Sequence, residues 1–498
     1  MLSLVTFWPA VAAAILTVLP RRTPARLFSR LWVAASTVEL ALVVVLWVGY
    51  RSGGGLQYQE NLPWIPSAGV GYHVGVDGLS LPLVALTAAL FLACAVYSLG
   101  QARRPRAYAA LFLGLETVCI GVFVALDLIL FFVYFDLSIV GMYFVIAGWG
   151  HGERARAAAL KFFLYTFVGS LALLLGFIGL YLAATPHTFD IAALTRADPL
   201  AGRGLYAGLV LLAIGVGLAI KTPTVPFHTW LPPAHTDAPA AGSAILAGVL
   251  LKLGTYGFVR IAMPLLPGAW RHYALVLIVV GAVSAVYGAL VALAQPNLKR
   301  MIAYTSVNHM GLVILGVGAA GVLAGTDTQA RSLAVTGAVT QMVSHGLITG
   351  ALFLLTGVLW ERTGSYQIDA HSGLAGPAPA FAGITAVAAF ASIGIPGFSG
   401  FVAEFQIFAG SLASQIAATA LAVAAIVITA ALFLRALQQM LVGPLRLPHG
   451  GRFAELSLTE AVAVIPLLVA SAAIGIAPRW LLDVIEPAAR HLVALVAR

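Results

Sequence analysis

The stretch LYAGLVLLAIGVGLAIKTPTVPFH, residues 205–228, joins a membrane-spanning run to a break in that run. Residues 205–220 carry no charge, and a helix of about 20 apolar residues crosses the hydrocarbon core of a bilayer. Pro223 and Pro226 then remove backbone donors and disfavour further helix. Lys221 stands where the run meets the break. The stretch therefore predicts a discontinuous transmembrane helix with a charged group at its interruption.

Apolar runs of this kind recur along the whole chain. The 498 residues are 61% hydrophobic and 9% charged, whereas a soluble chain carries about 25% charged residues. Only helices or closed barrels satisfy their backbone in lipid, and the runs are too long for barrel strands. We therefore predict an all-α integral membrane protein of about fourteen transmembrane helices, which begin near residues 2, 31, 79, 108, 128, 160, 205, 238, 271, 301, 331, 376, 408 and 456.

The connections between these spans limit the chemistry of the chain. The longest cover residues 51–78, 184–204 and 359–375, and they are too short for a nucleotide-binding fold or a large redox cofactor. Cys94 and Cys119 lie inside apolar spans, where a lone thiol fills the core, so we expect neither a disulfide nor a metal cluster. The expectation is a chain without a cofactor or metal of its own.

The net charge of +9 indicates membrane topology rather than nucleic-acid binding, because the basic residues are scattered or stand in short loop clusters. Fifteen of them fall in alternate loops on one side, including Arg21, Arg22, residues 103–106 and Lys299, and nine fall on the opposite side. The richer side is expected to be cytoplasmic, which places both termini outside. The first apolar run lacks a basic region and a cleavage site, so we interpret it as a retained helix.

A second break, Gly394-Ile-Pro-Gly-Phe-Ser-Gly400, lies five spans after the first. Paired interruptions at matching positions point to an ion path between structural repeats. We therefore divide the chain into helices 1–3 (residues 1–107), two five-helix repeats (residues 108–262 and 271–440), and a last helix with its tail (residues 441–498).

Lysine usage points to proton exchange. The chain has 23 arginines and four lysines, and two of the four, Lys221 and Lys252, lie within apolar spans. Arginine keeps its proton inside a protein, whereas a buried lysine gives its proton up readily. The alternative is a structural ion pair or a snorkelling side chain, but both lysines are far from the ends of their spans. We therefore interpret them as proton carriers.

Carboxylates and histidines inside the spans are the natural partners of these lysines. Asp136 lies in the fifth span, and Glu404 follows the second break. Such a carboxylate costs a few kcal/mol in a bilayer unless it is paired, protonated or hydrated. Imidazole titrates near neutral pH and can pass protons through water. The predicted relay comprises His228, His235, His309 and His345, with three weaker acidic candidates: Glu116, Asp127 near a span end, and Glu39, for which a structural role stays open.

Five motifs stand out between residues 70 and 440: VDGLS at 76–80, KFFLY at 161–165, TVPFHTWLPPAH at 224–235, NLKRMIAYTS at 297–306 and IPGFSGF at 395–401. They are long and specific, and they resemble the proton-pumping membrane subunits of respiratory complex I. That family also includes subunits of multisubunit cation/proton antiporters and of membrane-bound hydrogenases. The resemblance implies fourteen helices, two inverted five-helix repeats with two discontinuous helices, and a hydrated chain of charged residues along the middle of the membrane.

The resemblance also assigns proton transfer to four residues: Asp136, Lys221, Lys252 and Glu404. Glutamate at the last position is typical of one of the three large paralogues of complex I, whereas the other two, subunits L and N, use lysine there. The family has glutamate in place of Asp136. Because aspartate is one methylene shorter, its carboxylate lies about 1.5 Å farther from a partner lysine. At an effective dielectric constant of about 20, this lowers the attraction from about 4 to about 3 kcal/mol.

The function that the resemblance implies is proton translocation coupled to quinone reduction elsewhere in a bacterial NADH-quinone oxidoreductase. NADH, FMN, iron–sulfur clusters and quinone are expected in partner subunits. The expected neighbours in the bacterial inner membrane are the antiporter-like subunits L and N. Two alternatives stay open. One is a subunit of a cation/proton antiporter or a membrane-bound hydrogenase, and the other is a membrane scaffold that retains the ancestral charges.

Overall fold

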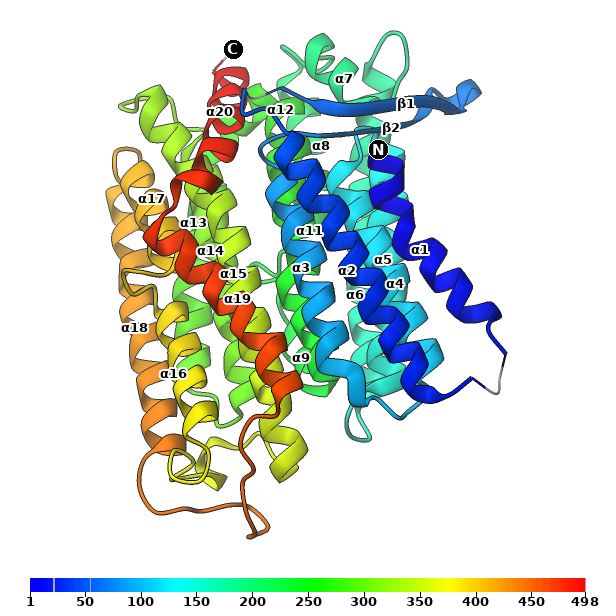
Figure 1. The fold of residues 1–498 in the computed structure, drawn as a ribbon. Helices are drawn as coiled ribbons and strands as arrows, with labels where there is room; N and C mark the ends of the chain where they lie inside the picture. Colours follow the sequence, from blue (N-terminus) through cyan, green and yellow to red (C-terminus); the bar gives the residue numbers. More distant parts are fainter. Residues whose placement is uncertain (21–22, 54, 498) are drawn as a thin grey trace.

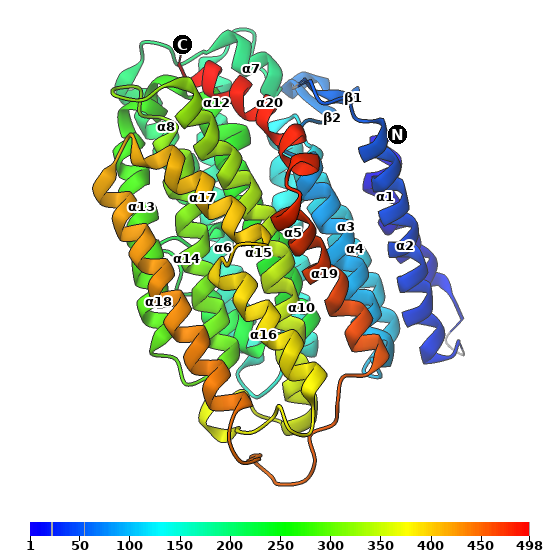
Figure 2. The ribbon, with the colours of Figure 1, turned by 60° about the vertical axis from the view of Figure 1, so that its left-hand side comes forward.

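The computed structural model describes residues 1–20, 23–53 and 55–497, which form a helical bundle (Figure 1 and Figure 2). Arg21 and Arg22, two of the basic residues counted above, lie outside the described residues. In the described part of the chain, twelve helices are long and apolar enough to cross a membrane. Two shorter apolar helices, Leu2–Val18 and Pro379–Ile393, supply the remaining spans. The predicted helical membrane fold of about fourteen spans is confirmed.

The elements follow one another in this order: α1 (Leu2–Val18), α2 (Ala25–Gly49), β1 (Gln57–Ile65), η1 (Pro66–Ala68), β2 (Val70–Val76), α3 (Leu81–Tyr97), η2 (Ser98–Gly100), α4 (Pro105–Val124), α5 (Leu128–Trp149), α6 (Ala155–Ala183), α7 (Ile191–Ala197), α8 (Gly204–Lys221), α9 (Leu231–Asp237), α10 (Ala240–Ile245), η3 (Leu246–Leu250), α11 (Leu251–Gly257), η4 (Phe258–Ala262), α12 (Met263–Leu265), α13 (Pro267–Leu293), α14 (Leu298–Ala319), α15 (Thr328–Thr363), η5 (Ile368–Ala370), α16 (Pro379–Ile393), α17 (Ser399–Leu412), α18 (Ile416–Leu441), α19 (Leu458–Ile476) and α20 (Arg479–Val496). The segments η3 and η4 are π-helical turns that run without a gap into α10, α11 and α12.

Two groups of helices repeat the same order. The first comprises α4, α5, α6, the broken helix α8–α9 and the continuous helix from α10 to α12. The second comprises α13, α14, α15, the broken helix α16–α17 and α18. The fourth member is interrupted in both groups, at residues 222–230 and 394–398, as the prolines and glycines of the sequence predict. Each helix of the second group comes five spans after its counterpart in the first group. Because successive spans alternate in direction and five is odd, each helix of the second group crosses the membrane in the direction opposite to its counterpart.

Three helices whose membrane-crossing stretches are fully buried form the middle of the bundle: the α10–α12 helix, α14 and α15. By contrast, α2 and α18 expose apolar side chains such as Val45 and Val427 on the outside. Lipid accepts these apolar side chains but disfavours charged ones. The charged residues of the predicted site accordingly lie inside the bundle, for example Lys252 on α11 and Glu404 on α17.

Both termini lie on the same side of the bundle, together with β1, β2, α7 and α20 (Figure 1). The two strands pair antiparallel, with Leu62 opposite Tyr72. Residues 51–78, expected only as a connection between spans, therefore contain a β-hairpin. Its alternating pattern is short and is interrupted by Pro63 and Gly71, so periodicity alone does not reveal it.

The C-terminal part differs in detail from the expected helix and tail. The last membrane span, α19, ends at Ile476, and the tail continues as a helix, α20, after Pro478. The buried residues of α20, among them Leu481, Ile485 and Leu492, recur at helical spacing and form one apolar face. In addition, α18 begins at Ile416 rather than near residue 408, because α17 continues the second broken span to Leu412.

Candidate functional site

Lys252 is completely buried on α11, directly after the π-helical turn η3. A π-helical turn displaces backbone carbonyls from the regular α-helical hydrogen-bond pattern. Lys252 uses one of these, because its Nζ donates to the carbonyl of Ala247 at 2.6 Å. The same Nζ lies 2.6 Å from Nδ1 of His345 on α15. An ammonium group only donates, so His345 accepts from a charged Lys252 at Nδ1.

The polar contacts continue from His345 toward the second broken helix. The rings of His345 and His309 lie 5.5 Å apart between their centroids. Nδ1 of His309 is 3.6 Å from Oε1 of Glu404, and Gln341 lies within 3.1 Å of the same His309 nitrogen. A cavity of about 10 Å³ lies between His309, His345 and Glu404, which is about the space that one water requires. We call Lys252, His345, His309 and Glu404 the Lys252 cluster.

The second break positions the carboxylate of Glu404. Gly394 ends α16 with a φ of 83°, a conformation that favours glycine. A Cβ at this position would also collide with the Glu404 carboxylate. A side chain at residue 394 would therefore strain the backbone and displace the Glu404 carboxylate, so the position requires glycine.

Lys221 ends α8 at the first break and is also buried. Its Nζ donates to Oγ of Ser138 at 3.1 Å and lies 4.9 Å from the centre of the Phe135 ring. Oδ1 of the predicted partner, Asp136, has no hydrogen-bond partner among the described residues. In this structure no ion pair joins Asp136 to Lys221, so the first half of the path is not continuous.

The two lysine-bearing helices approach each other beside the first break. A Cβ on Gly254 would lie 2.7 Å from the backbone nitrogen of Thr222. Only glycine allows α8 and α11 to approach this closely. Thr222 follows Lys221, and Gly254 lies two residues after Lys252. Oγ1 of Thr222 is buried there and finds no partner within the described chain. The approach therefore brings the two halves of the predicted path together.

The remaining sequence candidates fall in separate places. His235 is fully buried and stacks on Phe353 with ring centroids 4.5 Å apart. His228 lies against Tyr287 of α13, apart from the Lys252 cluster. Glu116 lies on α4 and accepts a hydrogen bond from Ser36 on α2. The four histidines therefore do not form one continuous relay, because only His309 and His345 belong to the Lys252 cluster.

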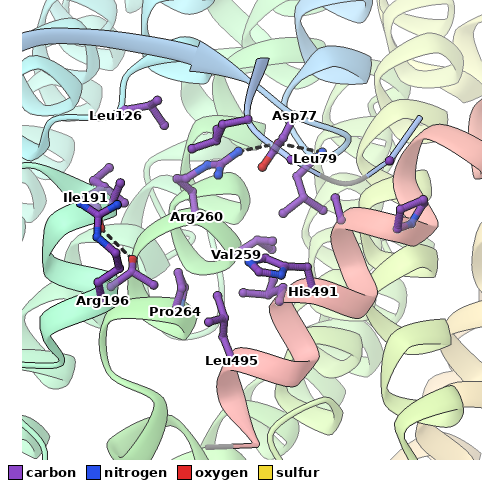
Figure 3. A pocket seen from close by; sticks show the side chains of 18 residues that line it. Asp77, Leu79, Leu126, Ile191, Arg196, Val259, Arg260, Pro264, His491 and Leu495 are labelled. Atoms are coloured by element: carbon purple, nitrogen blue, oxygen red, sulfur yellow. Dashed lines mark hydrogen bonds and ion pairs between the residues drawn. The ribbon is translucent and has the colours of Figure 1, made fainter. Parts of the chain in front are cut away.

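The structure adds a buried ion pair that sequence reasoning missed. Arg260 donates to Oδ1 of Asp77 at 2.6 Å and to the hydroxyl of Tyr256 at 2.8 Å. Tyr256 and Arg260 follow Lys252 at four-residue intervals, so all three share one face of the α10–α12 helix. Asp77 stood in the VDGLS motif, but nothing in the sequence identified its partner. The pair borders a cavity of about 500 Å³ that α20 closes through His491 and Leu495 (Figure 3).

The environment of Lys299 also differs from the sequence prediction. It was counted with a basic loop cluster, yet it is completely buried at the start of α14. Its Nζ donates to the carbonyl of Ala238, which follows α9. The apolar-span criterion missed it because NLKRMIAYTS begins with polar residues. Three of the four lysines are therefore buried.

The chemistry of these groups is acid–base chemistry. In the residues that the structure describes, no group of three or more His, Cys, Asp or Glu side chains is placed to hold a metal ion. Amine, imidazole and carboxylate groups can each bind and release a proton. Their succession in the Lys252 cluster is thus suited to moving protons across the middle of the bundle.

A family model described as NADH:quinone oxidoreductase/Mrp antiporter, TM matches residues 125–429 of the chain. The matched range contains both broken helices and every member of the Lys252 cluster. The chain belongs to this family.

Curated members of this antiporter family are similar to the chain over nearly its whole length. NADH-quinone oxidoreductase subunit M of Rickettsia bellii is 35% identical, over 99% of this chain and 98% of its own. The protein with the same name from Rhodobacter capsulatus is 38% identical, over 99% and 96% of the two chains. The similarity therefore includes the hairpin and α20, which lie outside the range of the family model.

Solved structures agree with the family assignment. A chain of respiratory complex I from Thermus thermophilus with bound NADH is 30% identical, covers 100% of both chains and superposes with a TM-score of 0.89. A chain of the Mrp complex from Dietzia sp. DQ12-45-1b superposes with a TM-score of 0.85 over 99% of both chains. At 24% identity, the second comparison shows the shared fold alone.

Proposed function

We propose that the chain is a proton-translocating membrane subunit, of the M type, of a bacterial NADH-quinone oxidoreductase. The observation that carries this proposal is the Lys252 cluster, in which an amine, two imidazoles and a carboxylate follow one another through the bundle. The names of the Rickettsia and Rhodobacter relatives support the choice of enzyme. In this proposal Asp136, Lys221, Lys252 and Glu404 transfer protons, and His235 assists at Lys252.

The distances in the Lys252 cluster suggest an order of transfer. Charged Lys252 passes a proton from Nζ to Nδ1 of His345 across 2.6 Å. The space beside His345 and His309 is about large enough for one water. Through such a water the proton moves on, because an imidazole can accept a proton at one ring nitrogen and donate one from the other. Glu404 then accepts it at Oε1. Lys252 and Glu404 both end neutral, so the transfer cancels two opposite buried charges.

Quinone reduction supplies the energy in this proposal, and it takes place in other subunits. NADH, FMN, iron–sulfur clusters and quinone bind to those partners rather than to this chain. The antiporter-like subunits L and N are the proposed neighbours in the bacterial inner membrane. Both termini face outward, because the basic loops, such as residues 103–106, lie on the opposite side and mark the cytoplasmic face.

The experiment that tests the proposal is NADH-driven proton uptake by vesicles that contain the assembled complex, normalised to the content of this subunit. Lys252→Met removes the amine and preserves length, and we expect proton uptake to fall by about 10²-fold, the typical worth of a positioned proton-transfer group. Lys161→Met is the matched control, because Lys161 is an exposed lysine on α6. Uptake at the wild-type rate in the Lys252 variant would favour the scaffold alternative.

Purification distinguishes the proposed enzyme from an antiporter or hydrogenase. A tagged chain solubilised gently should retain partner subunits with flavin and iron–sulfur clusters, together with NADH-dependent quinone reduction. A preparation that exchanges cations for protons, and contains no flavin, would instead identify the cation/proton antiporter. Nickel-containing partners would identify the hydrogenase.

A further inference from the structure

A pair of buried acids lies outside the path described above, between α2 and α4. Glu39 and Glu116 are both completely buried. Oε2 of Glu116 accepts a hydrogen bond from Ser36 at 3.0 Å. Both carboxyl oxygens of Glu39 and Oε1 of Glu116 have no partner in the described part of the chain. Three carboxyl oxygens without partners inside a membrane protein require a proton, a water or both.

The register of the helices places the two acids together. Trp32 on α2 packs against Phe112 on α4, and Ser36 contacts Glu116. Both pairs are 80 residues apart, so α2 and α4 run parallel in a constant register. Glu39 is therefore level with residue 119, one turn beyond Ser36. Helical side chains lean toward the N-terminus of their helix, which directs the Glu39 carboxyl back toward Glu116.

The helix α1 closes this site from a third side and adds groups that suit water. Trp8 donates to the carbonyl of Ala35 at 2.9 Å, which places Thr6 near the level of Ser36 and Glu39. The Thr6 hydroxyl is fully buried and has no partner within the described residues. Pro9 lies inside α1 and leaves the carbonyl of Val5 without its helical donor. A hydroxyl and a free carbonyl thus point to water beside the two acids.

The Glu39–Glu116 pair also lies at about the same depth in the membrane as the amine of Lys221. On the antiparallel helices α4 and α5, Gly121 packs against Tyr134, and Leu115 packs against Gly141. Residue 138 of α5 therefore lies opposite residues 117–118 of α4. Since Lys221 donates to Ser138, its amine is at the height of the turn from Glu116 to Cys119. Cys119 is fully buried on this same turn of α4, three residues after Glu116.

We propose that Glu39 and Glu116 share one proton in a hydrated site and exchange protons with Lys221. This inference rests on the proposed role of Lys221. Two neighbouring carboxylates in a medium of low dielectric constant do not both ionise, so the pair carries one proton and one negative charge. The ammonium group of Lys221 balances that charge.

The proposed exchange balances in atoms and charge. One N–H bond of Lys221 breaks, a water carries the proton past Cys119, and one O–H bond forms on the ionised member of the pair. The lysine and both acids are then neutral, and the reverse step restores the starting state. Two further titratable groups of the described chain are near Glu116, the thiols of Cys94 on α3 and Cys119 on α4. Lys221 thereby has a second proton acceptor besides Asp136.

Infrared difference spectroscopy on the assembled complex in its membrane tests this proposal, because the C=O stretching band of a protonated carboxylic acid is separate from that of a carboxylate. We expect NADH-driven turnover to change this band in the wild type. One component of the change should be lost in Glu39→Gln, in Glu116→Gln and in Lys221→Met, whereas the component that Glu404 contributes should be lost in Glu404→Gln and kept in the Glu39→Gln and Glu116→Gln variants. Glu361→Gln is the matched control, because Glu361 is an acid at the edge of the bundle that binds Tyr97, and it should keep the change.

Two outcomes would overturn the proposal. A band that belongs to the pair but stays constant during turnover and pH titration would identify a permanently protonated structural contact. A wild-type spectrum without such a band would show that both acids are ionised. If a glutamine variant fails to assemble, Glu39→Asp keeps the acid and should shift the band. Failure of the proposed function is recognised separately, because Lys221→Met would then pump normally, and the resting-state titration of the pair does not depend on pumping.

Discussion

The two halves of the predicted path are built differently, although both contain a broken helix and a buried lysine. In the second half, Lys252 contacts His345 directly, and His309 lies within 3.6 Å of Glu404. In the first half, Lys221 binds the neutral hydroxyl of Ser138. Asp136 forms no ion pair with Lys221 and keeps a carboxyl oxygen without a partner in the described structure. We call the second half the connected half because its four groups follow one another at close range, although Nε2 of His345 and Oε1 of Glu404 have no hydrogen-bond partner among the described residues. In the first half, no contact joins the lysine to its predicted acid.

This difference shows that a repeated backbone does not repeat its electrostatics. Neither lysine is paired with a carboxylate. Lys252 contacts an imidazole that can accept its proton, whereas Lys221 contacts only a hydroxyl and an aromatic ring. Asp136 is one methylene shorter than a glutamate would be, and it forms no ion pair with Lys221. The first half is therefore the place where movement of a side chain would open or close the path, and the variants below test this contrast.

The largest effect is expected at Glu404, the end of the connected half. Glu404→Gln keeps size and hydrogen bonding but removes titration, and proton uptake by vesicles should fall by about 10²-fold. Glu404→Lys keeps a titratable group and reverses its charge, so partial uptake is expected. Glu486→Gln is the control, because that acid is on the surface beside Arg490. Wild-type uptake by the Glu404→Gln variant would remove this residue from the path.

A smaller but clear loss is expected at Lys221. Lys221→Ala deletes the amine, and Lys221→Arg retains a charge that does not lose its proton. Both should assemble, and both should lower proton uptake and coupled quinone reduction by about tenfold, which corresponds to about 1.4 kcal/mol. Quinone reduction and uptake are measured on the same vesicles. Full pumping by the arginine variant would show that Lys221 acts as a fixed charge.

A change of opposite sign is expected when the reach of Asp136 is extended. Asp136→Glu moves the carboxylate about 1.5 Å toward Lys221, which adds about 1 kcal/mol of attraction at an effective dielectric constant of about 20. Uptake should be retained or rise, by up to about fivefold. Asp136→Asn should lower proton uptake, because asparagine cannot carry the negative charge of the acid. An active asparagine variant would mean that another acid, such as Glu116, serves Lys221.

The smallest effect is expected at His228, which the structure separates from the connected half. His228→Gln should change proton uptake by less than about twofold, because the cost of a substitution that breaks no site contact stays within about 0.5 kcal/mol. His345→Gln, made in parallel, should lower uptake by about 10²-fold. Equal losses in the two variants would contradict the division between His228 and the Lys252 cluster.

Much of the site could be predicted from single positions in the sequence. Lys221, Lys252, Asp136 and Glu404 stood out because a charged residue inside an apolar run is costly in lipid. The breaks were visible because proline and glycine act on their own neighbours. Their partners were not visible. His345 meets Lys252 from 93 residues away, and no local pattern encodes a contact between α11 and α15.

The sequence by itself determined that this protein spans a membrane, where its helices break and that Lys221, Lys252 and Glu404 are buried, because hydrophobicity and backbone sterics act within about 20 consecutive residues. Only the tertiary structure decided which of those charges meet. It joined Lys252 to His345, paired Arg260 with Asp77, and set Ser138 rather than Asp136 against Lys221. These contacts depend on how helices cross and on differences of an ångström in side-chain reach, and neither is a property of any one segment.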